Sequence, residues 1–276
     1  MRHPNAYMRV AVVGHVEWVE FARVDRVPAA GDIVHSRETW EGAGGGGAVA
    51  AVELLKLAGS ADLFTALGDD EIGHRAEEEL SDRGLEVASA RRAEPQRRAF
   101  TFVDAGDERT ITVLGDKLVP RGSDPLPWDR LDGADAVYFA SGDAGALRGA
   151  RAARVVVATA RELPTLREAE VELDALVASG KDAGERYEPG DLDPPPRVSV
   201  ITTGAGGGRY ETVDGRSGSY AAARVRGAIA DAYGCGDSFA AGLTFGLGSG
   251  LDLDAALELG ARCGAAALSW RGPFDR

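Results

Sequence analysis

The residues best suited to chemistry lie near the C-terminal end, where Asp237 follows the loop Gly234-Cys235-Gly236. Small loop residues let other atoms approach the backbone closely. The apolar run from 239 to 247 is typical of a buried helix. The loop therefore opens onto a helix N-terminus, whose free N–H groups and positive dipole end attract an anion such as phosphate. A carboxylate placed there suits one task, which is accepting a proton from a hydroxyl group as it attacks a phosphoryl group.

The same residues also fit a simpler interpretation, in which Asp237 caps the helix after an ordinary glycine turn. Short Gly/Asp motifs recur by chance, so the loop alone does not decide between the two. The rest of the chain must supply the elements that position such a site.

The composition indicates a soluble globular protein of 276 residues, with 44% hydrophobic and 27% charged residues. This length predicts one large domain. The net charge of −13 argues against a nucleic-acid partner. Lysine occurs only at positions 56, 117 and 181. The charge of a bound nucleotide would therefore be balanced by arginines, backbone N–H groups and Mg²⁺.

The two cysteines, Cys235 and Cys263, follow no disulfide or metal-site spacing, which favours a reducing setting. Met1 to Tyr7 is polar and has no signal-peptide core. No apolar run is long enough to span a membrane. The sequence therefore predicts a cytoplasmic protein without a membrane partner.

Strands and helices alternate along the chain, which predicts a parallel sheet with helices on both faces. Apolar runs predict buried strands at 9–14, 135–142, 154–159 and 197–203, and helices are expected at 49–58, 73–83, 144–153 and 254–268. Two excursions, at about 16–40 and 97–114, alternate polar and apolar residues as half-exposed hairpins do. Asp69 and Asp70 precede a helix and are interpreted as turn and N-cap residues.

The segment Asp231-Ala-Tyr-Gly-Cys-Gly-Asp237 resembles the D-T-x-G-A-G-D signature of the ribokinase-like (PfkB) carbohydrate kinases. Segments 41–48, 68–73, 98–110 and 202–207 are similar, in order, to other motifs of that family. The resemblance implies an α/β, ribokinase-like three-layer αβα fold with a mainly parallel sheet. It also implies a single domain over 1–276, with a small β-strand lid at about 16–40 and 97–114.

The resemblance implies an ATP-dependent kinase that transfers the γ-phosphoryl group to a hydroxyl of a sugar or sugar-like small molecule. Asp237 would be the general base, and the amides of Gly234, Cys235 and Gly236 would form an anion hole. The family pattern also gives roles to residues around the nucleotide. Thr203, Gly204 and Gly207 would lie near its phosphates, and Cys263 would lie on the helix over the adenine. Ser179 and Asp182 stand in place of a motif that organises Mg²⁺, and Asp231 would lie at a monovalent-cation (K⁺) site. Ser179 fits a helix N-cap equally well.

The acceptor side departs from the family pattern. Gly44 and Gly45 match its sugar-binding glycines, but its usual Asp and Asn are replaced by Val19 and Val49. A site without those partners does not bind an ordinary pentose in the usual way, so an unusual substrate is expected. Glu17 and Glu20 flank Val19 and could replace the lost Asp or face solvent. Arg97 and Arg98 are candidate contacts for an anionic substrate.

The sequence leaves three further interpretations open. The altered pocket would also suit a non-catalytic, ligand-binding or regulatory member of the same fold. An apolar pocket would suit a nucleoside kinase. Independently, Cys235 at a helix N-terminus could have a lowered thiol pKa. The lid strands of some relatives join two subunits, so the resemblance also admits a homodimer.

Overall fold

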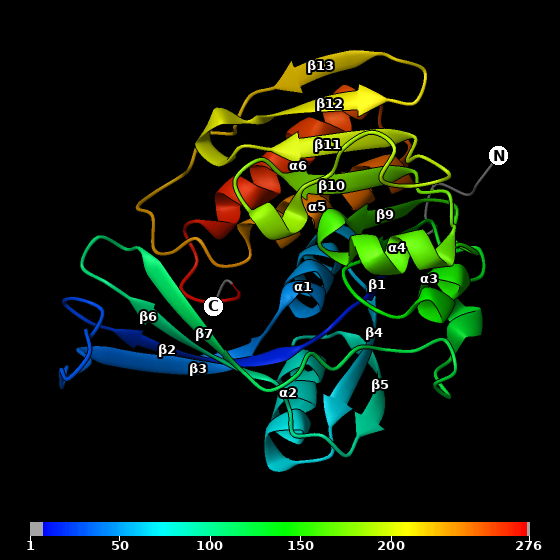
Figure 1. The fold of residues 1–276 in the computed structure, drawn as a ribbon. Coiled ribbons are helices and arrows are strands. Elements are labelled where there is room, and N and C mark those ends of the chain that lie inside the picture. The colour runs from blue at the N-terminus through cyan, green and yellow to red at the C-terminus, as the bar shows by residue number, and fades with distance from the viewer. Residues whose placement is uncertain (1–7, 275–276) are drawn as a thin grey trace.

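The computed structural model describes residues 8–274, so the polar segment Met1 to Tyr7 lies outside the described part. The described chain forms one nine-stranded sheet and one four-stranded sheet (Figure 1). The large sheet has the order β13-β12-β11-β10-β9-β8-β1-β4-β5. It is parallel from β11 to β5, and β12 and β13 extend it as antiparallel strands.

The strands of the large sheet have these bounds: β1 Val10–Val13, β4 Asp62–Gly68, β5 Glu86–Arg92, β8 Ala136–Phe139, β9 Val156–Thr159, β10 Ala175–Ser179, β11 Val198–Thr202, β12 Gly208–Thr212 and β13 Ser217–Tyr220. Every residue of β1, β8 and β9 is buried. These strands are apolar throughout because helices cover both of their faces.

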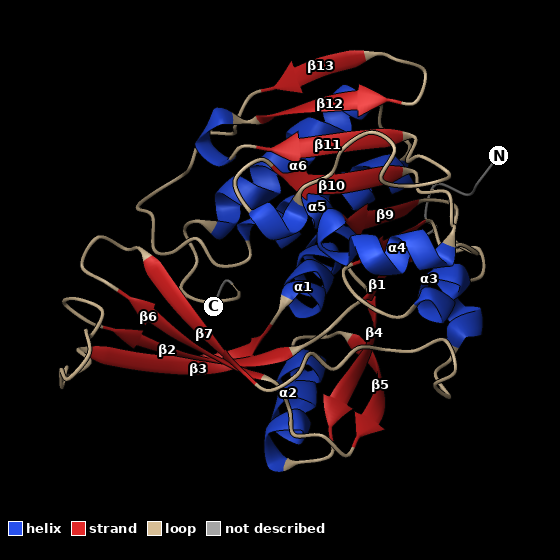
Figure 2. Cartoon of the chain, in the orientation of Figure 1, coloured by secondary structure: helices blue, strands red, loops and turns tan. Residues whose placement is uncertain are grey.

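Helices pack on both faces of the large sheet (Figure 2). One hydrophobic core joins the sheet to α1 Gly46–Ala58, α2 Glu71–Asp82, α5 Cys235–Ser249 and α6 Leu253–Ala267. A second core lies under α3 Ala144–Ala150 and α4 Leu163–Ala169. The predicted three-layer αβα fold is confirmed.

The small sheet has the order β3-β2-β6-β7 and consists of two antiparallel hairpins. Its strands are β2 Glu17–Arg23, β3 Glu38–Gly44, β6 Arg98–Val103 and β7 Arg109–Leu114. β2 and β6 join the hairpins as parallel neighbours. This sheet corresponds to the expected lid, and Figure 1 shows it projecting from the side of the large sheet at which α1 begins.

Two local predictions differ from the structure. Gly42, Ala43 and Gly44 belong to β3 and pair with Glu17–Val19, although a loop was expected there. A glycine is needed at position 44 of this strand, because a Cβ there would lie 2.8 Å from Val19 Cγ2. Helix α1 consequently begins at Gly46 rather than at Val49. The predicted cap of α2 is confirmed, since the side chain of Asp70 accepts a hydrogen bond from the Gly73 amide.

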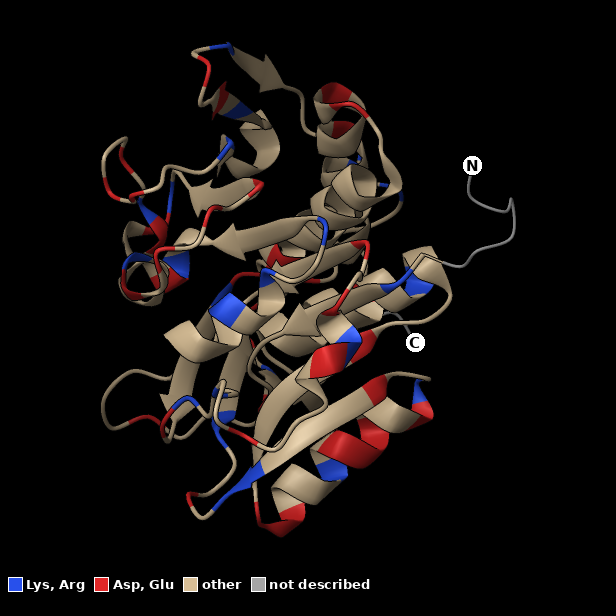
Figure 3. Ribbon diagram, turned by 90° about the vertical axis from the view of Figure 1, so that its right-hand side faces the viewer, with Lys and Arg blue, Asp and Glu red and all other residues tan. Residues whose placement is uncertain are grey.

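The charged residues of this acidic chain are interspersed over many elements rather than gathered by sign (Figure 3). No helix within residues 8–274 has the length and apolar character that crossing a bilayer requires.

Candidate active site

Asp237 lies where the first turns of two helices meet. Helix α5 begins after Gly234, which has a left-handed backbone (φ 73°) and leaves no room for a side chain, since a Cβ there would lie 2.7 Å from Val49 Cγ1. A Cβ at Gly46, the first residue of α1, would lie 2.8 Å from Asp237 Oδ1. The loop, α1 and the carboxylate are therefore packed against one another through glycines.

The amides of the predicted anion hole are free to bind a ligand. Within residues 8–274, the N–H groups of Gly234, Cys235 and Gly236 donate to no carbonyl or carboxylate oxygen. Gly236 is exposed, and a Cβ there would meet no atom within 4 Å. Free amides at the positive end of a 15-residue helix form a suitable site for a phosphoryl group.

The surroundings of Asp237 make it a proton acceptor near neutral pH. Burial raises the pKa of Asp237 to about 7, and the negative charges of Glu185 and Glu17 add to this effect. The positive charges of Arg161 and Arg109 oppose it. A carboxylate with a pKa close to the working pH is suited to general base catalysis.

Of these charged residues only Glu17 was predicted from the sequence, and Glu185, Arg161 and Arg109 were not. Glu185 ends the short 3₁₀ helix Ala183–Glu185, three residues after the predicted Asp182. Arg161 bridges both acids, with Nη2 2.7 Å from Asp182 Oδ2 and Nε 3.0 Å from Glu185 Oε1. Glu185 could have been found from the sequence, because it lies only three residues after the predicted Asp182. Arg161 follows a different strand, so no nearby motif pointed to it.

Ser179 and Asp182 lie together at the end of β10. Ser179 Oγ accepts hydrogen bonds from the amides of Lys181 and Asp182, which closes a turn rather than capping an α-helix. The hydrogen bond from the Gly184 amide and the charge of Arg161 lower the pKa of Asp182. Within residues 8–274, no group of three or more His, Cys, Asp or Glu residues could hold a metal. Ionised Asp182 with Glu185 still fits Mg²⁺, which is often bound by one or two carboxylates together with substrate phosphates.

The predicted phosphate-binding glycines form a tight turn between β11 and β12. Thr203 Oγ1 donates to the Gly207 carbonyl at 3.1 Å. Gly207 has a positive φ of 78°, and a Cβ there would lie 2.1 Å from the Tyr220 carbonyl oxygen. This turn therefore contacts the end of β13, where the segment leading to the signature loop begins.

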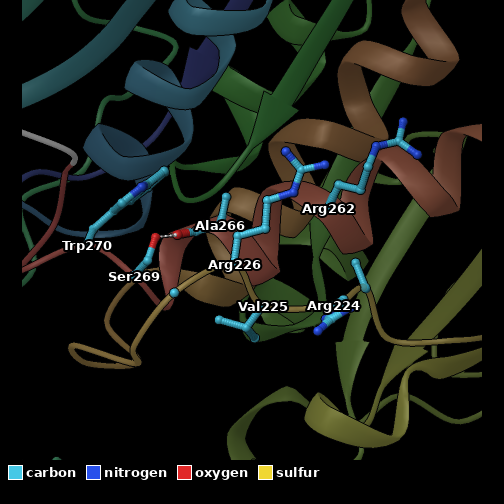
Figure 4. A pocket seen from close by; sticks show the side chains of 9 residues that line it. Arg224, Val225, Arg226, Arg262, Ala266, Ser269 and Trp270 are labelled. Carbon is cyan, nitrogen blue, oxygen red and sulfur yellow. Dashed lines mark hydrogen bonds between the residues drawn. The ribbon is translucent and has the colours of Figure 1, made fainter.

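A cavity of about 910 Å³ lies between that segment and α6 (Figure 4). Three arginines, Arg224, Arg226 and Arg262, line it together with Trp270. Cys263 faces elsewhere: it is buried against α5, with Sγ 2.8 Å from the position of a Cβ on Gly242. The predicted adenine-side residue thus packs between two helices, and its neighbour Arg262 faces the cavity.

Asp231 is buried and ties the signature loop to the C-terminal segment. Its two carboxylate oxygens accept hydrogen bonds from the amides of Tyr233 and Gly272, each at 2.7 Å. Burial raises the pKa of Asp231, although these hydrogen bonds oppose the shift. This geometry gives Asp231 a structural role in holding the loop.

The predicted acceptor residues Gly44 and Gly45 lie at the entry to α1. The Gly45 amide donates to Tyr233 Oη at 2.8 Å, and a Cβ at Gly45 would lie 3.0 Å from the Glu17 amide nitrogen. Glu17 is buried beside Arg97, whose Nε lies 2.8 Å from Glu17 Oε1. Arg98 instead pairs with Glu20 on the small sheet.

The predicted lowering of the Cys235 pKa is wrong. Burial raises the pKa of the Cys235 thiol to about 11, and the nearby carboxylates of Asp231 and Asp237 add to the effect. Burial and negative charge together outweigh the position at a helix N-terminus.

Comparison with known proteins agrees with the fold described above. Residues 8–162 and 147–274 match the model of the pfkB family carbohydrate kinases. An ATP-dependent ribose-1-phosphate kinase of Halopiger xanaduensis is 29% identical, over 96% of this chain and 93% of that protein. A putative ribokinase of Agrobacterium tumefaciens has a similar structure (TM-score 0.82, 20% identity, 97% and 93% coverage). So does the ribokinase of Arabidopsis thaliana complexed with ribose and ATP (TM-score 0.76, 17% identity, 97% and 94% coverage).

The chain belongs to the PfkB family of carbohydrate kinases. It is a phosphotransferase with an alcohol group as acceptor, and within the family it is a sugar or nucleoside kinase.

Proposed function

We propose that the protein transfers the γ-phosphoryl group of ATP to a hydroxyl of a sugar or sugar-like molecule, with Asp237 as the general base. The observation that carries this proposal is the position of Asp237, against Gly46 and beside the free amides of the 234–236 loop. The base and the anion site are thus within reach of one transferring group. The carboxylate takes the proton of the attacking hydroxyl while the amides stabilise the negative charge on the phosphoryl oxygens.

The cavity beside α6 is the proposed place for the adenosine part of ATP. Its volume of about 910 Å³ lies within the range of small-molecule sites. It adjoins the segment that follows Tyr220, which Gly207 contacts. A nucleotide with its base there would direct its phosphates toward the 203–207 turn and the signature loop. Arg262 and the arginines of the 224–226 segment offset the negative charge of the chain.

Mg²⁺ fits the proposed reaction through Asp182 and Glu185. When bound, the ion would neutralise charge on the phosphate oxygens. The protein's own part is to position both carboxylates through Arg161, which contacts both. Asp231 is not proposed as a ligand of a monovalent cation, since both of its carboxylate oxygens accept backbone amides.

The acceptor is best sought among sugars and sugar phosphates. The relative from Halopiger xanaduensis is named for ribose 1-phosphate, which makes that compound the first to test. Val19 and Val49 do not favour a nucleoside, because both are fully buried and pack against Gly44 and Gly234 rather than forming an open apolar surface. A regulatory role does not require a base with a pKa of about 7, so Asp237 favours catalysis.

The test is ATP consumption with a panel of ribose, ribose 1-phosphate, other sugar phosphates, polyols and nucleosides. The expected result is turnover with one acceptor class that disappears in Asp237→Asn. ATP that binds but is never consumed with any acceptor would favour a non-catalytic protein instead.

A further inference from the structure

A group of ionisable residues borders the acceptor glycines, and of these only Glu17 was given a part above, through the effect of its charge on Asp237. It consists of His15, Glu17, Arg97, Lys117 and Glu162, and is called here the Glu17 cluster. A Cβ at Gly45 would lie 3.2 Å from atoms of both His15 and Glu17, whereas a Cβ at the next residue, Gly46, would meet Asp237. Because neighbouring Cα atoms are about 3.8 Å apart, one small molecule lying on these two glycines would reach both the base and the cluster.

Two cations of the cluster act on the same carboxylate. Arg97 Nε lies 2.8 Å from Glu17 Oε1, and Lys117 forms an ion pair with the buried Glu162. Burial alone would raise the pKa of Glu17. His15, Arg97 and Lys117 together lower it, and the first two do so in direct contact with the Glu17 carboxylate. Arg97 precedes β6 and Lys117 follows β7, so the two cations come from the two ends of this hairpin.

These cations have unused hydrogen-bond donors. Among the described residues, the Nη groups of Arg97 donate no hydrogen bond, and Lys117 has Glu162 as its one partner. Arg92 offers a contrast, because it donates through both Nη groups to Asp124 and also to the Val119 carbonyl. An arginine has five N–H donors and a lysine three, so Arg97 and Lys117 retain donors for an additional anion.

The family's Asp and Asn, which contact the hydroxyls of a sugar, are absent from the acceptor side of this chain. Val19 and Val49 occupy their positions and are committed to packing against glycines. Ser141 is fully buried, and its hydroxyl contacts His15 Nδ1 at 3.1 Å. At Gly45 the Glu17 cluster lies beside the Tyr233 hydroxyl and supplies the charged groups that can recognise an acceptor.

We infer that Arg97 and Lys117 determine acceptor specificity by binding a phosphate group at the end of the acceptor remote from the hydroxyl that Asp237 deprotonates. This inference rests on the proposed function and assigns the acceptor to the sugar phosphates. Glu17 and Glu162 hold the two cations in place before the substrate arrives. The loss of either cation weakens recognition of the phosphate and leaves the chemistry at Asp237 intact.

The experiment compares Arg97→Met and Lys117→Met with Arg98→Met. Arg98 is the neighbour of Arg97 in the chain and pairs with Glu20 on the small sheet, so it is a matched control. For ribose 1-phosphate, each of the first two variants should lose about 10- to 100-fold in kcat/KM, as expected for a charge-assisted hydrogen bond. For ribose they should change by less than about threefold, and Arg98→Met should change neither value. Arg97→Lys and Lys117→Arg should recover part of the loss.

A binding measurement tests this inference independently of the proposed function, because it does not require phosphoryl transfer. Titration of ribose 1-phosphate into Asp237→Asn, with and without Arg97→Met or Lys117→Met, measures the phosphate contact without turnover. Weaker binding in both double variants supports the inference even if no acceptor is phosphorylated. Equal losses on ribose and ribose 1-phosphate, or unchanged binding, would overturn it. If Arg97→Met does not fold, the same measurements on Lys117→Met test the inference, since Lys117 is the more exposed of the two side chains.

Discussion

The carboxylate of Asp237 rests on Gly46, with Oδ1 only 2.8 Å from the position that a Cβ would occupy. The two residues lie far apart in the chain, yet their helices α1 and α5 begin at the same place. The first turn of α1 therefore determines where the proposed base can lie.

Gly46→Ala tests this relationship. Alanine is compatible with the first turn of a helix, but its methyl group must displace the carboxylate. We expect kcat to fall about 10- to 100-fold, because a displacement of about 1 Å in a catalytic group has an effect of that order. The KM for ATP should change little. Gly149→Ala on α3 is the control, since its Cβ would meet only Trp128, at an ordinary 3.8 Å. Unchanged kcat in Gly46→Ala would contradict a catalytic role for the Asp237 carboxylate.

The pH dependence of kcat/KM should respond oppositely to two neutral substitutions. The charge of Glu185 raises the pKa of Asp237 and that of Arg161 lowers it. Activity requires the ionised base, so it rises with pH through about 7 in the parent protein. Glu185→Gln should move this rise to lower pH and Arg161→Gln should move it to higher pH. Movement in one common direction would show that another group controls the profile.

Asp237 should lower stability at the pH at which it functions. Its pKa is 3.8 unfolded and about 7 folded, so folding disfavours the ionised form. The resulting loss of stability begins as pH rises above about 4 and is complete above about 7. Asp237→Asn should therefore be more stable at pH 8 by about 1–3 kcal/mol, after allowance for partial solvent screening. Denaturant unfolding at pH 5 and pH 8 measures this. A gain that is larger at pH 5 would contradict the sign.

The proposed base and its loop could be located from the sequence because they are contiguous. Residues 231–237 carry the glycine turn, the anion site and the carboxylate within one short segment, followed at once by the helix that orients them. The alternation of strands and helices was likewise sufficient for the αβα fold. Such features depend on local patterns that a sequence displays directly.

The charged neighbours of the base could not be predicted, because strand order brings them together. Arg161 follows β9 and Glu185 follows β10, which are adjacent in the large sheet. The replacement of two family residues by Val19 and Val49 indicates an altered acceptor side, which stays a prediction. The packing of both valines against glycines was invisible until the small sheet and α1 were placed together.

Cys235 should resist alkylation despite its place at a helix N-terminus. Burial raises its thiol pKa to about 11, so roughly 0.1% is thiolate at pH 8. Iodoacetamide should label it much more slowly than it labels glutathione at the same pH, as followed by mass spectrometry. Labelling at the rate of glutathione would show that the loop opens or that the thiolate is stabilised.

The most direct measurement is single-turnover phosphoryl transfer from ATP to the best acceptor in the parent protein and in Asp237→Asn. The account predicts that the variant binds ATP within about threefold of the parent and loses about a thousand-fold in the rate of transfer. A variant that binds ATP normally and transfers phosphate within about tenfold of the parent rate would contradict the assignment of Asp237 as the base.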